Sequence, residues 1–303
     1  MLQSKTLTQN KEQITKENKA MKNTKKEADS KNTNKNYGYV KNRFEQKCRD
    51  FNSTFVLIAK SWIKDPSGII SLFVIPTFYF VIFYFLLRNK YSQSLIGYLM
   101  LPPLTVITTL GTGLINWKNS VFLKRIDTTG ISKTTFLLSL WTFNLLVGLL
   151  GVCVQIIVGL IIAQGDAVDQ YNSMNWGWFI LGTIFISLMS IGLATLIAGI
   201  FSSQSMVQGV TMIIYFLSLF LSGIMIPYTT IGSVKALRII SYFTPYMYGN
   251  AVTSKSIESA WQMFDGPTYQ VFTEIWQPCV ASAGIIVALF AITTMTFKWS
   301  SND

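Results

Sequence analysis

The sequence predicts an all-α integral membrane protein with six transmembrane helices. Half of the 303 residues are hydrophobic and the mean hydropathy is +0.39, which is too apolar for an ordinary soluble domain. Residues 170–234 contain no charged side chain, and that interval is long enough for two spans and a turn, because one helical span needs about 20 residues. An amphipathic interfacial helix is expected before the first span, and a re-entrant outer hairpin between the fifth and sixth.

Residues 1–41 are expected to form a disordered basic tail on the cytoplasmic side. They are rich in Lys, Asn, Thr and Glu, and such a composition cannot bury a core. They also lack the apolar segment of a secretory signal peptide. Fifteen of the 25 Lys and Arg precede Asp65, against six acidic residues there, so the net charge of +11 belongs mainly to this end. The tail is either simply solvated or drawn to anionic lipid.

Residues 42–64 are predicted to form an amphipathic helix. Apolar side chains recur at spacings of four and three, which is one stripe of a helix: Phe44, Cys48, Phe51, Phe55, Ile58 and Trp62. The other faces are basic and polar, a pattern that fits the plane of the membrane interface. The alternative is an ordinary helix that packs against the rest of the protein.

The first two spans are expected at residues 66–87 and 95–115. Both contain proline, which transmembrane helices accept because neighbouring groups satisfy the freed carbonyls. The second span also carries threonines at helical spacing. Thr105 and Thr109 are candidates to line a polar pathway, although hydrogen bonding between helices is the commoner use of such residues.

Residues 117–133 are expected to form a cytoplasmic loop with a short helix over 119–128. The loop carries Lys118, Lys124, Arg125 and Lys133, and cytoplasmic loops are enriched in such residues. Gly130 is suited to stop the helix, and Ser132 to cap the next span.

The remaining spans are expected at residues 136–163, 176–201, 206–226 and 278–297, followed by a tail at 300–303. The third and fourth are joined by a short loop with Asp166 and Asp169, and a polar outer loop over 254–277 precedes the sixth. With a cytoplasmic N-terminus, this topology places 20 Lys and Arg inside and five outside, in agreement with the positive-inside rule.

Residues 227–252 are predicted to form the re-entrant hairpin. The fifth span breaks at Pro227, and an apolar segment interrupted by Pro245 follows after a polar turn. This segment is too short for a span. Backbone of this kind is tolerated at membrane depth only where protein or a water-filled cavity satisfies its polar groups. A surface helix pair on the outer face is the alternative.

The motifs of several other classes are missing from the sequence. It has no GxxxxGK[ST] phosphate loop, so it is not expected to bind ATP in that way. It has no histidine and no ionisable residue within the predicted spans, where proton-driven transporters usually need them. The three cysteines are far apart without a CxxC pattern, so neither a disulfide nor a metal site is expected. We therefore expect no catalytic residues, and energy must come from another chain unless transport is passive.

Three segments resemble the type-2 ABC exporter permeases. The stretch LSGIMIPYTTIGSVKALRIISYFTPYMYGN is similar to the end of their fifth span and the following outer hairpin, with Gly223, Pro227 and Pro245 on the motif positions. The stretch IAKSWIKDPSGIISLFVIPTFYF resembles their first-span entry, and residues 122–132 resemble their coupling helix. The acidic residue usual before that helix is missing, and Thr129 with the next glycine replaces the usual proline.

The resemblance implies the membrane subunit of an ABC exporter. Such a subunit moves a hydrophobic or amphiphilic substrate outward with ATP hydrolysed by a separate nucleotide-binding subunit, which holds the ATP and magnesium, so this chain carries no cofactor. It implies a dimer with a second copy or a related permease in the lipid of the cell membrane, both termini cytoplasmic, and no nucleic acid partner. The alternative is a six-span channel or membrane scaffold protein with no ATPase partner.

The resemblance also implies three groups of site residues. Coupling to the ATPase partner would involve Phe122, Lys124, Arg125, Asp127 and Thr129. The outer gate and re-entrant turn would contain Gly223, Pro227, Pro245 and Tyr246. The pathway lining would include Thr105, Thr109, Phe216 and Phe220.

Overall fold

The computed structural model describes residues 45–87, 95–266 and 269–297. The chain divides into two compact units, Met1–Asn52 and Ser53–Asp303. Within the described residues of the larger unit, six helices are long and apolar enough to cross a membrane. The all-α architecture with six spans is therefore confirmed. The predicted tail over residues 1–41 and the C-terminal residues 300–303 lie outside the described residues.

Helical backbone covers residues 45–63, and the part from Ser53 onward belongs to the large unit. Its apolar stripe packs against protein: Ile58 is fully buried, and the rings of Phe55 and Trp62 lie 5.6 and 5.9 Å from that of Phe143 on the third span. Val56, Leu57 and Ile63, on the other side, are exposed. A position of this helix in the membrane interface stays a prediction.

The first span consists of α2 (Pro66–Ile69), the π-helical turn η1 (Ile70–Val74) and α3 (Ile75–Leu87). Asp65 caps its start by accepting a hydrogen bond from the backbone N–H of Ser67 at 3.1 Å. The π-helical turn ends at Val74, two residues before Pro76. Proline removes one helical hydrogen bond and clashes with the carbonyl four residues earlier, and a π-helical turn is one way to relieve that clash within a continuous helix.

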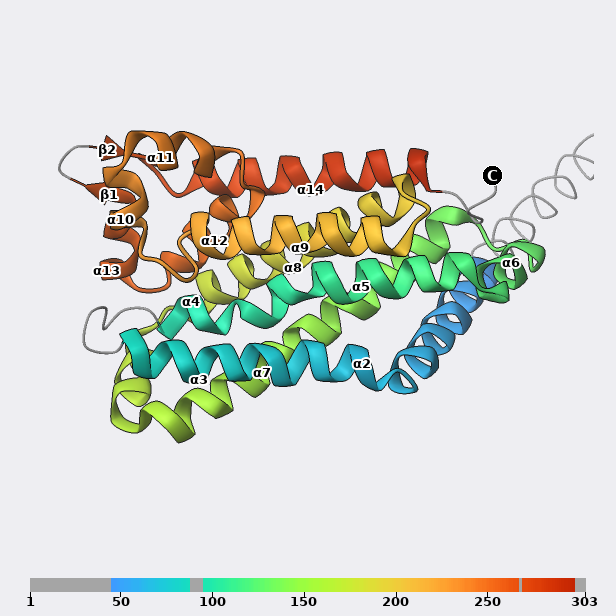
Figure 1. Cartoon of the computed structure of the whole chain (residues 1–303), viewed down its shortest axis with the longest axis horizontal. Coiled ribbons are helices and arrows are strands. Elements are labelled where there is room, and N and C mark those ends of the chain that lie inside the picture. Colours follow the sequence, from blue (N-terminus) through green and yellow to red (C-terminus); the bar gives the residue numbers. More distant parts are fainter. Residues whose placement is uncertain (1–44, 88–94, 267–268, 298–303) are drawn as a thin grey trace, which may run out of the picture. The chain divides into compact units, whose positions relative to one another are not determined.

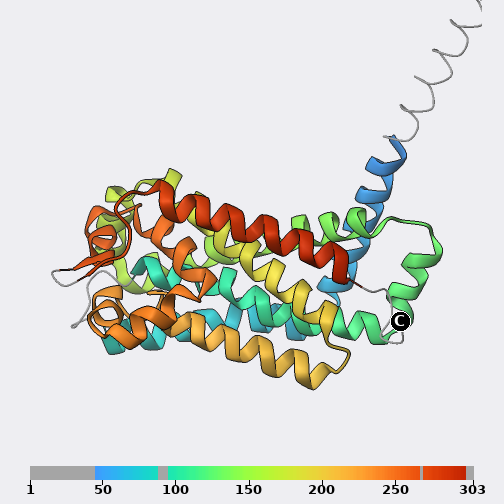
Figure 2. The ribbon, with the colours of Figure 1, turned by 90° about the horizontal axis from the view of Figure 1, so that it is seen from above.

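The second span, α4 (Leu95–Leu99) with α5 (Leu101–Asn119), is the most buried of the six. It lies in the middle of the bundle, against α7, α8 and α9 (Figures 1 and 2). It ends four residues after the expected 115, because Lys118 in its last turn is buried against α8 (Trp176–Ile200). Pro102 and Pro103 stand at the start of α5, where a missing N–H costs little.

The third span belongs to α7 (Lys133–Ser173), which continues through the region expected to be a loop. Gln164 has a positive φ of 42° and kinks this helix. Beyond the kink, the hydroxyl of Tyr171 lies against Gly159, whereas a straight helix would separate residues 12 apart by about 18 Å. The chain therefore folds back on itself, and Ala167 is buried in the contact.

The fifth span, α9 (Gln204–Leu221), ends before the expected Ile226. Gly223 has a φ of +85°, and a glycine with left-handed backbone just beyond the last turn is a common helix stop. The sixth span is α14 (Trp276–Thr296). Both spans, like the first, have most of their residues uncovered within this chain.

A compact cap joins α9 to α14. It contains α10 (Tyr228–Ser233), α11 (Lys235–Tyr242), α12 (Pro245–Ser254), α13 (Glu258–Trp261), the 3-10 turn η2 (Gln262–Phe264) and a short antiparallel ladder of β1 (Asp265–Gly266) with β2 (Tyr269–Gln270). α10, α11 and α13 lie at one end of the bundle, and α6 (Val121–Thr128) lies at the other (Figure 1). We name these the cap end and the α6 end.

Candidate functional site

α6 is a short amphipathic helix that presents its charged face to the outside. Its N-terminus is capped by the Ser120 hydroxyl, which accepts from the backbone N–H of Phe122 at 3.1 Å. Leu123 and Ile126 are buried, and Gly130, with a φ of +75°, follows its end. Of the residues predicted for coupling, Phe122 is half-buried and the others are exposed, namely Lys124, Arg125, Asp127 and Thr129.

Lys118 fixes the base of α6 to the end of α8. Its side chain is only 3% exposed, and its Nζ donates to the carbonyls of Ala198 at 2.9 Å and Gly199 at 3.4 Å. The last carbonyls of a helix have no partner within it, and a cation is favourable there. The ring of Trp117, at the end of α5, contacts that of Phe122 on α6, with centroids 5.1 Å apart. This contact is a second anchor for the base of α6. Sequence reasoning placed Lys118 in the basic loop and missed this role.

An apolar groove of 350 Å³ runs between α6 and the helix before the first span. Leu57, Phe122 and Ile126 contribute apolar side chains, and Arg125 is the one charged side chain among the described residues that line the groove. Because α6 offers charges on its exposed face and an apolar groove beside it, the surface can receive an apolar side chain from another protein while its charges set the orientation.

A polar groove of 200 Å³ opens between α2, α5 and α9 near the α6 end. Most of its lining is hydroxyl, amide or carboxylate: Asp65, Ser67, Ser71, Thr108, Thr109, Thr112, Asn116 and Gln208. A polar surface of this kind is costly in a lipid-facing span, so this side of the bundle is suited to water, a substrate or another protein.

The four predicted lining residues do not share this groove. Thr109 lines it. Thr105 is only 3% exposed and its hydroxyl donates to the carbonyl of Leu101, so it packs inside the bundle and does not line this groove. Phe216 and Phe220 lie further along α9 and are 43% and 40% exposed, so they form an apolar surface beyond the groove.

α11 and α12 form a helical hairpin whose second arm packs on α8. Gly249 lies against Ile186, and Gly182 lies against Thr253, so the two helices run antiparallel. Pro245 occupies the first turn of α12, where its missing N–H costs little. Phe243, at the bend before it, is 84% exposed.

Tyr246, predicted for the outer gate and re-entrant turn, lies inside the protein rather than at an open surface. Its side chain is fully buried in the contact between α12 and α8, because the first turn of α12 lies against α8 rather than at the surface. Asn250, one turn later, is also buried, and its Nδ2 donates to the carbonyl of Ser222 at 3.0 Å. These two residues therefore hold the hairpin in place.

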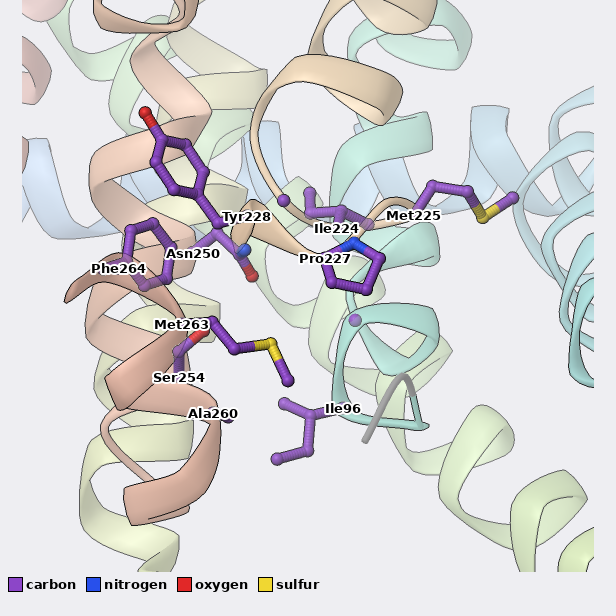
Figure 3. Close-up of a pocket in the computed structure, with 12 residues that line it drawn as sticks. Ile96, Ile224, Met225, Pro227, Tyr228, Asn250, Ser254, Ala260, Met263 and Phe264 are labelled. Atoms are coloured by element: carbon purple, nitrogen blue, oxygen red, sulfur yellow. The ribbon is translucent and has the colours of Figure 1, made fainter. Parts of the chain in front are cut away.

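Gly223 and Pro227 line a small cavity at the cap end (Figure 3). In Figure 3 the side chain of Met263 points toward Ile96 below them. The cavity measures 30 Å³, which is room for one or two water molecules. It is too small for a transported substrate, so these two residues shape the turn after α9.

An aromatic cluster stabilises the cap. Tyr228 stacks on Phe264 with ring centroids 4.6 Å apart, and its hydroxyl lies 2.6 Å from that of Ser241. Burial raises the pKa of Tyr228 to about 12, although the hydrogen bond with Ser241 opposes this shift. Arg238 lies 5.8 Å from the ring centroid of Tyr269, within the range of a cation–π contact.

Comparison with known protein families decides the family. A family model described as ABC-2 type transporter matches residues 54–256, more than half of the chain. The chain belongs to the ABC-2 type transporter family. The match extends from the helix before the first span to α12, so it includes α6, the polar groove and the hairpin. A search of curated proteins gives no match.

Membership identifies the chain as an integral membrane protein and as the permease subunit of an ABC transporter. An ABC-2 permease implies pairing with an ABC nucleotide-binding subunit, and the permease is generally not itself catalytic. Sequence reasoning missed Asp65, Asn116 and Gln208 in the polar groove. Asn116 could have been found, since it continues the row of Thr108 and Thr112 at spacings of four.

Proposed function

We propose that this ABC-2 permease is half of an exporter, in which two such subunits enclose a pathway and a separate ATP-binding subunit docks on α6. The observation that carries the proposal is the geometry of α6. Its charged face is exposed, while its base is held to α8 through Lys118. A docking surface tied to a span in this way can transmit movement of the partner into the bundle.

The α6 end is assigned to the cytoplasm. Four described cations lie at or next to α6, namely Lys118, Lys124, Arg125 and Lys133, and loops rich in Lys and Arg favour the cytoplasmic side. The cap end then faces outward. This orientation places ATP and magnesium on the partner at the cytoplasmic surface, and the membrane is the cell membrane.

The depth of the α11–α12 hairpin supports its role as an outer gate. Gly249 packs on Ile186, which lies ten residues into α8 from Trp176. At 1.5 Å per residue this is about 15 Å, and Pro245 lies roughly 6 Å deeper. The bend therefore reaches well into a hydrocarbon core of about 30 Å. In a dimer, two such hairpins beside the two α9 helices would close the pathway from outside.

The polar groove and the apolar surface of α9 support an amphiphilic substrate. Groups such as Asn116 and Gln208 suit a polar head, and the exposed Phe216 and Phe220 suit an apolar body. The same surface suits contact with a second copy of the chain, because it combines exposed aromatics with a recess that a dimer would enclose.

Reversing the charges of α6 should separate the permease from its ATPase. The double variant Lys124→Glu with Arg125→Glu leaves the buried residues of α6 unchanged, so it should still insert and fold. We expect association with the ATP-binding subunit to weaken about tenfold or more. The measurement is co-purification of a subunit with a phosphate-binding loop from native membranes, together with vanadate-sensitive ATPase activity of the complex.

The matched control is Lys235→Glu, which reverses an exposed charge at the cap end. It should leave both readouts unchanged. If the double variant keeps its partner and its ATPase activity, α6 is not the docking surface. If no ATP-binding subunit co-purifies even with the wild-type chain, the proposal of an exporter gives way to that of a channel or scaffold.

Cys48 tests the orientation. Its side chain is exposed, and it precedes the first span, so it should face the cytoplasm. A membrane-impermeant thiol reagent should label it in inside-out vesicles and not in intact cells. The variant Cys48→Ser identifies the signal, because the thiol of Cys153 is also exposed. Labelling of Cys48 from outside intact cells would reverse the assigned topology.

A further inference from the structure

A second cavity joins the polar groove, and its lining is chemically distinct. It measures 70 Å³ and lies between residues 61–68, α5 and α7. Three aromatic side chains line it, Trp62, Trp117 and Phe143, together with Asp65 and Asn144. The cavity and the groove share four lining residues, which are Asp65, Gly68, Thr109 and Gly113. They therefore form one continuous recess, which we name the aromatic recess.

Among the described residues that line the aromatic recess, Asp65 is the single charged one. Its Oδ1 accepts from the backbone N–H and the hydroxyl of Ser67, at 3.1 and 2.6 Å. A methyl group built on Gly68 would lie 3.4 Å from Asp65 Oδ2 and 3.6 Å from Trp62 Nε1. The second carboxylate oxygen and the indole edge therefore border the same small space. Among the described residues, no cation lies within ion-pair distance of Asp65.

The hydroxyl groups of α5 present acceptors to the recess. Those of Thr108, Thr109 and Thr112 donate to backbone carbonyls of α5 itself. Their hydrogens are therefore occupied within the helix, and what they offer outward is oxygen lone pairs. Asn144 donates one hydrogen of its Nδ2 to the carbonyl of Leu140, and its amide oxygen is a further acceptor. The hydroxyl groups of α5 and the carboxylate of Asp65 therefore favour a ligand that carries hydrogen-bond donors or positive charge.

Aromatic rings next to a carboxylate are a favourable environment for an organic cation. Aromatic side chains attract positive charge at their ring faces, most strongly where water is excluded, whereas the Nε1 edge of Trp62 is a hydrogen-bond donor; Asp65 supplies the opposite charge. The cavity of the recess, at 70 Å³, exceeds the space of a single water molecule several times, so it admits a substituted ammonium group.

An apolar track leads away from the recess along α9. Met212 lines the groove, and Phe216 and Phe220 follow at spacings of four, the positions that share one helix face. All three are exposed, at 38%, 43% and 40%. A polar head in the recess would thus place an attached hydrocarbon chain on this track, which runs toward the cap end (Figure 1).

We propose that the aromatic recess binds the head group of a cationic amphiphile, with Asp65 as its counter-charge, the rings of Trp62, Trp117 and Phe143 as its walls, and the α9 track as the support for its apolar chain. This inference rests on the proposed function, because it takes the recess as the place where the exported substrate enters from the cytoplasmic side. It adds the charge and the chemical class of that substrate.

The test is equilibrium binding to the full-length chain in lipid nanodiscs, without ATP or a partner. The probes are dodecyltrimethylammonium, dodecyl sulfate and the uncharged dodecyl maltoside, which share one apolar chain. We expect specific, saturable binding of the cation only. Asp65→Asn should weaken it about tenfold or more, and so should Trp62→Leu.

Asp65→Asn is a conservative variant, because Asn caps a helix about as well as Asp. The matched control is Asp169→Asn, which removes an exposed carboxylate outside the recess and should leave binding unchanged. Equal binding of all three probes, or undiminished cation binding in Asp65→Asn, would overturn the inference. Binding is measured without an ATP-binding subunit, so the two proposals can fail separately. A chain that binds the cation but has no ATP-binding partner would refute the exporter and would still support the binding site in the recess.

Discussion

Replacing Gly182 with valine should detach α12 from α8 and open the hairpin. A Cβ atom at this position would lie 2.6 Å from the backbone nitrogen of Thr253 and 2.8 Å from its Cα. Real Cβ atoms do not approach backbone this closely, and a backbone cannot rotate out of the way as a side chain can. The two helices must therefore separate. Overpacking of this kind typically costs about 1–3 kcal/mol and occasionally more, and valine adds a branched side chain to the clash.

The effect of Gly182→Val should be measurable at the bend of the hairpin. In a chain whose native cysteines are replaced, a spin label at Phe243 is expected to be shielded from water-soluble relaxation agents, because the proposed gate would place the bend deep in the bilayer. In Gly182→Val the label should become accessible, proteoliposomes should leak protons, and the melting temperature should fall.

The matched control for this variant is Gly284→Ala. Gly284 lies in α14 with nothing within 4 Å of an added Cβ, so alanine should be neutral or slightly stabilising there. Retained shielding and an unchanged melting temperature in Gly182→Val would show that contact with α8 does not hold the hairpin. Free access to the label already in the unsubstituted background would make α11 and α12 a surface pair.

Local signals in the sequence were sufficient for several element boundaries. Ser132 caps α7 by accepting from the backbone N–H of Thr135, and Gly130 ends α6 with a positive φ, both as predicted. Pro245 begins α12. Each of these depends on one side chain or one backbone conformation, which is why a single residue identity predicts it.

Sequence reasoning failed where tertiary contacts override local preference. The kink of α7 is at Gln164, a residue that rarely adopts positive φ, so the residue type gives no warning of it. Thr105 and Thr109 have the same side chain one turn apart, and only the packing of α5 buries the first and exposes the second to the groove. Burial of this kind depends on neighbours that a single helical pattern does not specify.

The aromatic recess could not be predicted from the sequence either, because tertiary packing assembles it. In the sequence, Asp65 is recognisable only as part of the break before the first span, and Trp62 and Phe143 only as apolar side chains. Their meeting depends on the packing of the helix before the first span against α7. The segments are about 80 residues apart in sequence, so no local motif joins them.

Lys118→Met should destabilise the α6 end and uncouple ATP hydrolysis from transport. Methionine keeps most of the side-chain volume but removes the ammonium, so the carbonyls of Ala198 and Gly199 lose a buried donor. A hydrogen bond to a charged group contributes about 1.5–3 kcal/mol, and the end of α8 also loses its favourable charge. We expect a lower melting temperature.

The comparison variant is Lys124→Met, six residues along the chain. Lys124 is exposed on α6, so its loss should leave the melting temperature unchanged and weaken association with the ATP-binding subunit. Lys118→Met should show the opposite pattern. In Lys118→Met the exposed face of α6 is intact, so the ATP-binding subunit should still bind. The movement of that subunit should no longer be transmitted to α8. ATPase activity should therefore persist without transport. If both variants changed the melting temperature and the association in parallel, the Lys118 contact would be ordinary packing rather than the link between α6 and α8.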